Sequence, residues 1–302
     1  FPADESNMKA LVRLDWNIND KNHLALRYNY TLNKLWNSPN ASSMDGGTRM
    51  VSARTSQNSM SYANSMYSMD NKISTVSVDL NSRFGNNISN QLLVTYSDIE
   101  DIRGSNSSKF PFIDIMNGYS TAADGTVTQT LEPYMSLGYE LFTWNNGVKN
   151  KVTTVNDNFT YYLGAHKLTA GISYEHQLAN NAYMRNGTGY YRYRSLDDFL
   201  SGAAPESVAL TYGYDGEKSP AAQVTFNQLG LYIQDELNPT KNLKLTAGIR
   251  FDHLGFDEDD VMRNNKIYEL DFGGRRVDTG KWPDGNIQIS PRLGFSWDVF
   301  GD

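Results

Sequence analysis

The stretch that decides the fold spans residues 229–251 and reads LGLYIQDELNPTKNLKLTAGIRF. Apolar side chains recur at every second position on both sides of a turn at 238–242, and polar side chains fill the positions between them. The apolar set is Leu229, Leu231, Ile233, Leu237, Leu243, Leu245, Ala247, Ile249 and Phe251. A period of two is typical of a β-strand with one apolar and one polar face. The stretch therefore predicts a β-hairpin.

The same unit recurs along the chain. Hairpins are predicted over 12–30, 76–96 and 155–174, and their turns lie at 19–22, 85–87 and 163–165. A further strand carries the alternating residues Ile289, Leu293, Phe295, Trp297 and Val299. The sequence thus predicts an all-β fold of nine antiparallel strands in one consecutive meander, with unpaired edges near 10–18 and 287–299.

Pairing across the turns supports this meander, because apolar residues must oppose apolar residues on one face. We expect Ile18 to pair with Leu24, Tyr161 with Leu168, and Leu237 with Leu243. On the convex, lipid-facing side we expect Leu14, Leu26, Val78, Val94, Ile172, Ile249 and Phe295. On the concave, lumen side we expect Arg13, Arg27, Asp79, Lys244, Arg250 and Arg292.

The connections between strands are asymmetric. Short turns lie at one end of the sheet, and long segments over 32–71, 100–150, 177–222 and 253–286 lie at the other. This asymmetry is typical of outer-membrane barrels. Strands of about 9–11 residues would suit a tilted membrane strand, and aromatics such as Trp16, Tyr96 and Trp297 lie near strand ends, as in an interfacial girdle.

One residue fits this pattern poorly. Asp157 falls on the apolar set of its strand, between Val155 and Phe159, where a lipid-facing carboxylate is disfavoured. We expect a local bulge that rotates Asp157 inward.

Composition narrows the function classes. The 302 residues hold 27 basic and 34 acidic residues, a net charge of −7, and no basic run, which argues against nucleic-acid binding. No apolar stretch approaches the roughly 18 residues of a membrane helix. Cysteine is absent, which excludes disulfides and thiolate metal sites. No signal peptide is visible at Phe1, and both ends look like cuts within a longer protein.

Residues suited to catalysis do not assemble into a site. No pair among His23, His166, His176 and His253 has zinc-site spacing, and no serine-based triad is recognisable. We therefore predict a non-enzymatic protein with no catalytic residue, no cofactor and no metal. The acidic run 257–260 suits calcium or plain solvation. Five methionines in 44–69 suit Cu(I), but their serine- and asparagine-rich setting favours a mobile loop.

Two long segments hold the candidate substrate contacts. An aromatic and basic run could stack on sugar or peptide, although the alternative is a loop that packs on its neighbours. The last long segment holds two adjacent arginines and a tryptophan, which are candidates for the same kind of contact and have the same alternative explanation. The candidates are Tyr190, Tyr191, Arg192, Tyr193, Arg194, Arg275, Arg276 and Trp282.

Four segments carry a family resemblance. Residues 231–236 (LYIQDE), 245–252 (LTAGIRFD), 290–295 (SPRLGF) and 193–200 (YRSLDDFL) resemble the barrel strands and a loop of TonB-dependent receptors, most closely the Oar-like subgroup. The resemblance is strong over 155–302. Over 1–154 the prediction of strands rests on the alternation of apolar and polar residues. These residues also have architectural uses: Glu236 beside Lys244, a Tyr232 ring covering Gly248, and a short helix capped by Ser195.

The resemblance implies a partial barrel. It implies that residues 1–302 form a sector of a transmembrane barrel of about 22 strands in the bacterial outer membrane, with a plugged lumen. The plug and the terminal strands would lie outside this chain. The implied partners are outer-membrane lipid, the plug domain of the parent chain, TonB through a missing N-terminal region, and an imported substrate. Peptide, glycan and metal chelate remain open.

Two other functions stay open beside energised import. One is a passive outer-membrane barrel, such as a porin or an adhesin-like protein. The other is a soluble extracellular β-rich binding module, whose apolar face a second sheet or the loops would cover. A plug domain upstream in the parent gene would support import over the passive alternative.

Overall fold

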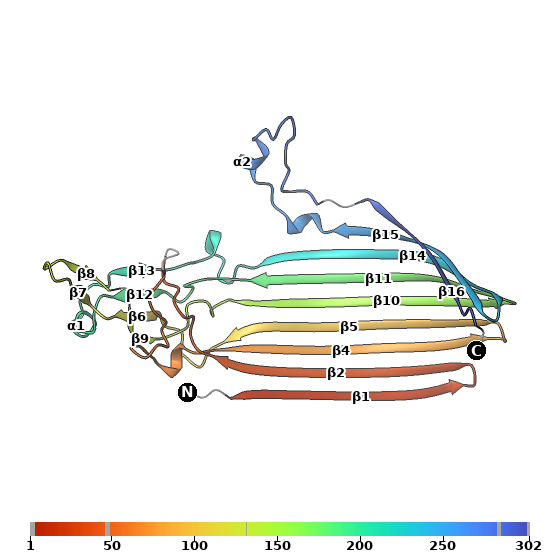
Figure 1. Cartoon of the computed structure of the whole chain (residues 1–302), viewed down its shortest axis with the longest axis horizontal. Coiled ribbons are helices and arrows are strands. Elements are labelled where there is room, and N and C mark those ends of the chain that lie inside the picture. The colour runs from red at the N-terminus through yellow and green to blue at the C-terminus, as the bar shows by residue number, and fades with distance from the viewer. Residues whose placement is uncertain (1–3, 46–48, 131, 283–284, 301–302) are drawn as a thin grey trace.

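A computed structural model describes residues 4–45, 49–130, 132–282 and 285–300. Its main sheet has nine antiparallel strands in chain order, so the predicted all-β meander is confirmed (Figure 1). The strands are β1 (Glu5–Asn19), β2 (Asn22–Asn37), β4 (Tyr67–Phe84), β5 (Ile88–Gly104), β10 (Gly147–Leu163), β11 (His166–Ala182), β14 (Ala222–Thr240), β15 (Leu243–Phe256) and β16 (Ile287–Trp297).

The long connections hold the remaining elements. The strands are β3 (Met60–Ser61), β6 (Phe112–Met116), β7 (Tyr119–Thr121), β8 (Val127–Gln129), β9 (Pro133–Leu137), β12 (Tyr190–Tyr193) and β13 (Ser207–Ala209). The helices are α1 (Leu196–Leu200), α2 (Asn265–Tyr268) and the 3-10 turns η2 (Ala63–Ser65), η3 (Tyr214–Gly216) and η4 (Glu258–Asp260). None of the helices within the described ranges is long and apolar enough to cross a membrane.

Alternation along the strands divides the main sheet into an apolar and a polar face. One register row joins Leu14, Leu26, Val78 and Val94, and the adjacent positions Arg27 and Asp79 face the other way. Side chains crowd on the polar face, where Ser77 is 8% exposed while its apolar neighbour Val76 is 47% exposed. This crowding identifies the polar face as the concave one, as expected from the sequence.

The predicted hairpin registers are partly right. Tyr161 pairs with Leu168 as predicted. In the first hairpin, Leu24 pairs with Trp16 rather than with Ile18, and in the fourth, Leu237 pairs with Leu245 rather than with Leu243. Both hairpins close in two-residue turns, the length that strand twist favours, and a bulge absorbs the extra residues. A shift of two positions keeps every side chain on its face, so the face assignment holds.

Most strands are longer than the predicted 9–11 residues: β14 has 19 residues and β4 has 18. The additional residues lie at the long-loop end, where Lys72, Glu100 and Lys149 are cross-strand neighbours. Charged side chains there end the alternation that marks a strand in the sequence, while the backbone ladder continues. Figure 1 shows the main strands extending towards the long connections.

Asp157 is not rotated inward, so the predicted bulge is wrong. Its strand pairs without a register shift with both neighbours, and Asp157 lies opposite Leu92 and Ile172 in the outward row. The carboxylate instead accepts a hydrogen bond of 2.7 Å from the side-chain amide of Asn90. This pairing satisfies one carboxylate oxygen on a predominantly apolar face.

Tyr232 covers a strand glycine, although not the predicted one. Tyr232 pairs with Arg250, and Gly248 lies opposite Gln234. The tyrosine ring lies over Gly171 on the other side, where any Cβ would overlap it, and its hydroxyl donates to Asn158. Glu236 likewise pairs with Thr246 rather than with Lys244, yet Lys244 still forms an ion pair with Glu236.

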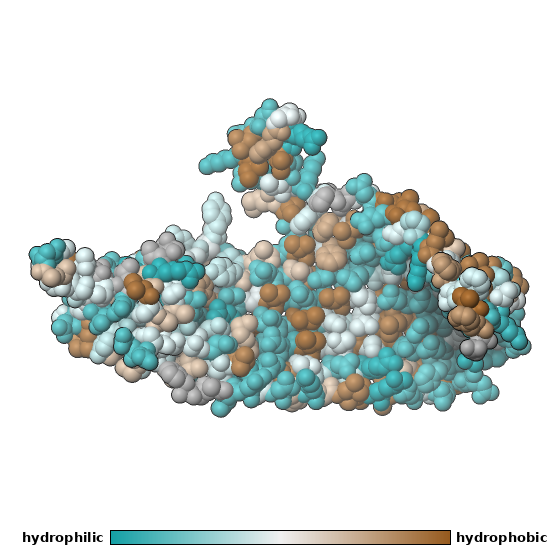
Figure 2. Space-filling model, in the orientation of Figure 1, coloured by the Kyte–Doolittle hydropathy of each residue, from teal (hydrophilic) through white to brown (hydrophobic). Residues whose placement is uncertain are grey.

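The main sheet ends at β1 on one side and at β16 on the other. Figure 2 shows apolar residues gathered along β16, at the right of the view, and Leu293 on this strand is 86% exposed. The sheet is therefore an open sector with two apolar edges.

Candidate functional site

Three of the four long connections fold together into one unit, which we call the loop cap and define as 38–66, 105–146 and 183–221. Its five-stranded sheet has the order β13-β12-β6-β9-β3, and each connection contributes at least one strand. The pairs β12–β6 and β3–β9 are parallel, which adjacent hairpin strands cannot be. Figure 1 shows this sheet beyond one end of the main strands.

An ion pair holds the connections of the loop cap together. Arg54 donates from Nε to Asp114 Oδ1 at 2.8 Å and from Nη2 to Oδ2 at 2.5 Å, and both side chains are 0% exposed. The guanidinium also donates to the carbonyls of Asn40 and Ser43, both at 2.6 Å. Bidentate geometry and full pairing are what a buried charge requires.

Two hydroxyls complete this centre. Ser136 Oγ donates to Asp114 at 2.6 Å, and Tyr190 donates to the same carboxylate at 2.8 Å. Burial raises the pKa of the Tyr190 hydroxyl well above its ordinary value, and the Asp114 carboxylate adds to the rise. We call Arg54, Asp114, Ser136 and Tyr190 the central polar cluster; it joins all three connections.

An apolar core lies beside the central polar cluster. It comprises Met44, Met50, Phe112, Met116, Leu141 and Tyr190. Phe112 stacks on Tyr190 with ring centroids 6.3 Å apart. Two of the five loop methionines therefore pack in a core, which replaces the mobile loop expected from the sequence. No group of histidine and acidic residues suited to a metal ion occurs within the described residues.

A second anchor fixes β12 to its neighbours. Arg192 Nη1 donates to Asp45 at 2.7 Å, and Arg192 Nε donates to Glu206 at 3.3 Å, while Ser207 also donates to Asp45. Burial lowers the pKa of Arg192, but Asp45, Tyr190 and Glu206 together outweigh this effect and the net shift is upward. Arg192 is thus held charged within the loop cap.

The predicted capped helix is confirmed and also packs in the loop cap. Ser195 Oγ accepts from the backbone N–H of Asp198 at 3.1 Å at the start of α1. Phe199 on this helix meets Tyr193 edge-on, with centroids 5.1 Å apart. The helix therefore covers part of the sheet face opposite the core.

The fourth long connection stands apart from the loop cap (Figure 1). Trp282 stacks on Phe256 at 4.5 Å, and its indole N–H donates to the carbonyl of Asp257 at 2.9 Å. Arg263 donates to Asp278 at 2.5 Å, and this hydrogen bond lowers the pKa of the Asp278 carboxyl. The acidic run is partly engaged, since Asp260 accepts from Gln223 at 3.2 Å.

The structure separates the predicted site residues into three groups. Tyr190 and Arg192 serve the interior of the loop cap, and Trp282 packs on Phe256 at the end of β15. Tyr191 and Tyr193 are half-buried, while Arg194 and the distant pair Arg275 and Arg276 are exposed. The candidates thus do not form one cluster, and a contact with substrate stays a prediction.

Exposed tyrosines are the surface feature that the sequence analysis did not single out. Tyr212 is 80% and Tyr214 is 93% exposed. Further exposed tyrosines of the loop cap are Tyr62, Tyr119, Tyr134 and Tyr183. The sequence could have indicated them, because these tyrosines lie in segments without the strand pattern, and rigid amphipathic rings suit contact surfaces.

The concave wall beneath the loop cap carries compensated charge. Arg250 donates to Asp252 at 2.7 Å and to Ser173 at 2.6 Å. Lys167 donates to Glu236 at 2.9 Å, and Arg27 lies 3.7 Å from Asp79. Neutral amides and hydroxyls fill the positions between these pairs, so the wall offers hydrogen bonds rather than a strong field of one sign.

Comparison with known proteins places these features in a family. The family model described as outer membrane beta barrel domain matches residues 2–302. No curated protein matches the chain in sequence.

Two solved structures share the fold. The outer membrane transporter YddB from Escherichia coli is similar, with a TM-score of 0.58 and 14% identity over 98% of this chain and 30% of that chain. FpvA from P. aeruginosa, bound to heterologous pyoverdines, has a TM-score of 0.51 and 14% identity over 98% of this chain and 34% of that chain.

The chain spans about a third of the length of these solved proteins. The predicted antiparallel meander of an outer-membrane β-barrel is confirmed, whereas the receptor or transporter role and the Oar-like subgroup stay predictions. Register, polarity and family match agree, and the chain belongs to the outer membrane beta barrel domain family.

Proposed function

We propose that this chain is the wall and loop sector of an energised importer, in which the loop cap meets a substrate outside the cell. The observation that carries the proposal is the loop cap itself. Three connections bury an ion pair and a core to hold one rigid surface at the long-loop rim of the sheet. A passive pore needs no such preorganised surface.

The surface chemistry favours recognition of a polar, ring-containing ligand. Tyr212 and Tyr214 are exposed in the segment that follows β13, the strand that pairs with β12 at the half-buried Tyr191. Arg194 is exposed immediately after β12. Aromatic faces stack on sugar and peptide groups, while guanidinium groups bind carboxylates. Peptides and glycans therefore suit the loop cap, and the concave wall adds neutral hydrogen-bonding groups.

The resemblance to TonB-dependent receptors supplies the energy source. In this proposal the parent chain carries a plug in the lumen, TonB contacts its N-terminal region, and proton-motive force drives entry. The two similar structures support a transport role, since one is named a transporter and the other holds a pyoverdine. We propose no enzymatic activity and no cofactor.

The test is growth and uptake in the native host. Cells with and without the parent gene are compared on peptides, glycans and ferric chelates as sole nutrient sources. Energised import predicts that uptake of one class needs the gene, needs TonB and stops with a protonophore. Uptake that survives the protonophore would instead favour the passive barrel.

Loop deletion tests the site within the same system. The deletion covers the parts of segments 177–222 and 253–286 that lie outside the main strands, namely 183–221 and 257–286. Removing them from the full-length receptor should abolish binding of that nutrient class, while the barrel still assembles in the membrane. Unchanged affinity would contradict a role for these segments. Replacing Tyr212 and Tyr214 by alanine is the milder variant, with Val127→Ala in the β7–β8 hairpin as the exposed control.

A further inference from the structure

The polar pair Asn90 and Asp157 lies on the lipid-facing side of the sheet, within its apolar band. Asp157 is flanked by Leu92 and Ile172 across the strands, and by Val155 and Phe159 along its own strand. All four neighbours point outward with it, so lipid tails surround the carboxylate. An ionisable group at this depth is unfavourable unless it has a partner.

Other parts of a closed barrel cannot cover this pair. A segment filling the lumen would contact the concave face, and further strands would join at β1 or β16. Asn90 lies on β5 and Asp157 on β10, in the middle of the strand order. Whatever covers the pair must therefore approach from within the bilayer.

The pair has a free donor and a free acceptor side by side. The Asn90 amide gives one N–H to Asp157 Oδ1 at 2.7 Å, and a bond to a carboxylate fixes this nitrogen as the atom that faces it. The second N–H of the amide and Oδ2 of Asp157 have no partner among the residues that the structure describes. Lipid tails can satisfy neither group.

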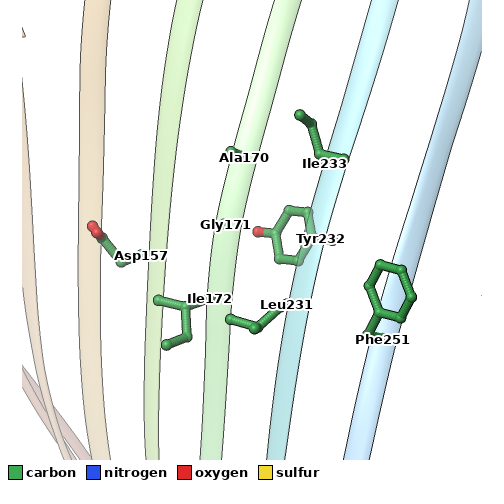
Figure 3. Close-up of a pocket in the computed structure, with 8 residues that line it drawn as sticks. All are labelled: Asp157, Ala170, Gly171, Ile172, Leu231, Tyr232, Ile233 and Phe251. Atoms are coloured by element: carbon green, nitrogen blue, oxygen red, sulfur yellow. The ribbon is translucent and has the colours of Figure 1, made fainter. Parts of the chain in front are cut away.

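A hollow of about 530 Å³ adjoins the pair. Six of its eight lining residues belong to the outward rows, and Ala170 and Gly171 at its floor are small. Figure 3 shows Asp157 at one side of the hollow and Phe251 at the other, with Ile172 and Leu231 between them. Small residues on a lipid-facing surface allow another protein surface to approach closely, as in helical membrane proteins.

We propose that this surface is an interface between two copies of the parent protein in the membrane. A two-fold axis beside the pair brings the free N–H of Asn90 in one copy to Oδ2 of Asp157 in the other, and the reverse bond follows by symmetry. The pair is self-complementary, because each copy offers a donor and an acceptor side by side. Apolar side chains of the second copy then fill the hollow over Ala170.

The test uses single cysteines in the full-length protein in its native membrane. The 302 residues contain no cysteine, and any cysteine elsewhere in the parent protein is replaced by serine. Leu92→Cys then reports on contact at the proposed axis, and Leu293→Cys on β16 is the outward control. Oxidation should give an adduct of twice the mass with Leu92→Cys and none with Leu293→Cys. Adding Asp157→Leu should reduce the adduct at least about tenfold, since two hydrogen bonds to carboxylates are lost.

A swap variant separates this interface from a folding defect. Asn90→Asp combined with Asp157→Asn keeps one donor and one acceptor on each copy, so it should restore the adduct that Asp157→Leu removes. Heat-modifiable gel mobility confirms that every variant assembles. Absence of the Leu92→Cys adduct, an adduct that Asp157→Leu leaves unchanged, or an adduct with a different protein would each overturn the proposal.

Discussion

Arg54 and Asp114 are 60 residues apart in the chain and form a bidentate ion pair from which solvent is fully excluded. The pair joins the first long connection to the second, and Tyr190 from the third donates to the same carboxylate. Removing one partner leaves an uncompensated buried charge, which costs far more than an exposed ion pair contributes.

We therefore expect Arg54→Leu to unfold the loop cap while the barrel stays assembled. The loss is on the order of 3–5 kcal/mol, the cost of breaking a buried pair. Limited proteolysis of the full-length protein in membranes should then cleave within 38–66 and 183–221. Asp124→Asn in the exposed hairpin between β7 and β8 is the matched control and should leave the cleavage pattern unchanged.

The raised pKa of Tyr190 predicts that the loop cap loses stability at alkaline pH. Its pKa is raised in the folded protein, so its contribution is fully present below the ordinary tyrosine pKa of about 10 and is lost as the pH rises towards the folded value. Protease resistance of the loop cap should fall above about pH 10. In Tyr190→Phe this part of the pH dependence should disappear; an identical alkaline profile would contradict the assignment.

The contact between Tyr232 and Gly171 predicts that a side chain at position 171 destabilises the barrel wall. A Cβ at residue 171 would overlap the Tyr232 ring, whose hydroxyl is held by Asn158. Gly171→Ala should destabilise the barrel by about 1–3 kcal/mol, the usual cost of overpacking, measured as a lower midpoint of denaturant unfolding in detergent micelles.

Two variants control for this effect. At Gly294, a Cβ would meet Thr246 at an ordinary 3.8 Å, so Gly294→Ala should change the unfolding midpoint little. Tyr232→Ala in the Gly171→Ala background should recover part of the loss. A midpoint that falls equally for both glycines would point to backbone effects instead.

The sequence predicted the main sheet well because each outward side chain is selected locally by its surroundings. Leu14, Val78 and Val94 must all be apolar to face lipid, so alternation marks each strand without knowledge of its partners. Strand ends were underestimated because the ladder continues where Lys72 and Glu100 no longer alternate with apolar residues. Asp157 was misjudged because its partner Asn90 lies 67 residues away.

The loop cap could not be predicted, because its determinants are contacts between distant segments. Nothing near Arg54 in the sequence indicates Asp114, and β12 pairs in parallel with β6 from another connection. Tyr190 and Arg192 were named as candidate substrate contacts, with packing against neighbouring loops as the alternative, and the structure places both side chains in the interior of the loop cap. Their roles in the interior follow only from the three-dimensional arrangement.

The last prediction concerns residues 1–302 in isolation. We expect this piece to be neither a soluble monomer nor active in transport. Leu14 on β1 and Leu293 on β16 are 63% and 86% exposed, and a continuous apolar band far exceeds the few hundred Å² that soluble monomers tolerate. The outer sides of β1 and β16 also carry unpaired backbone groups, which template aggregation in water.

Insertion into lipid does not stabilise these edges either, because lipid cannot pair with their backbone groups. Each unpaired backbone group costs several kcal/mol in hydrocarbon, so a spanning sheet must close. The measurement is the mass of the isolated piece in detergent-free solution by light scattering, with the full-length protein in detergent as the control. Large aggregates are expected. A monodisperse monomer with a cooperative thermal transition would contradict the open sector and favour a soluble β-rich module, because only a covered apolar face permits that behaviour.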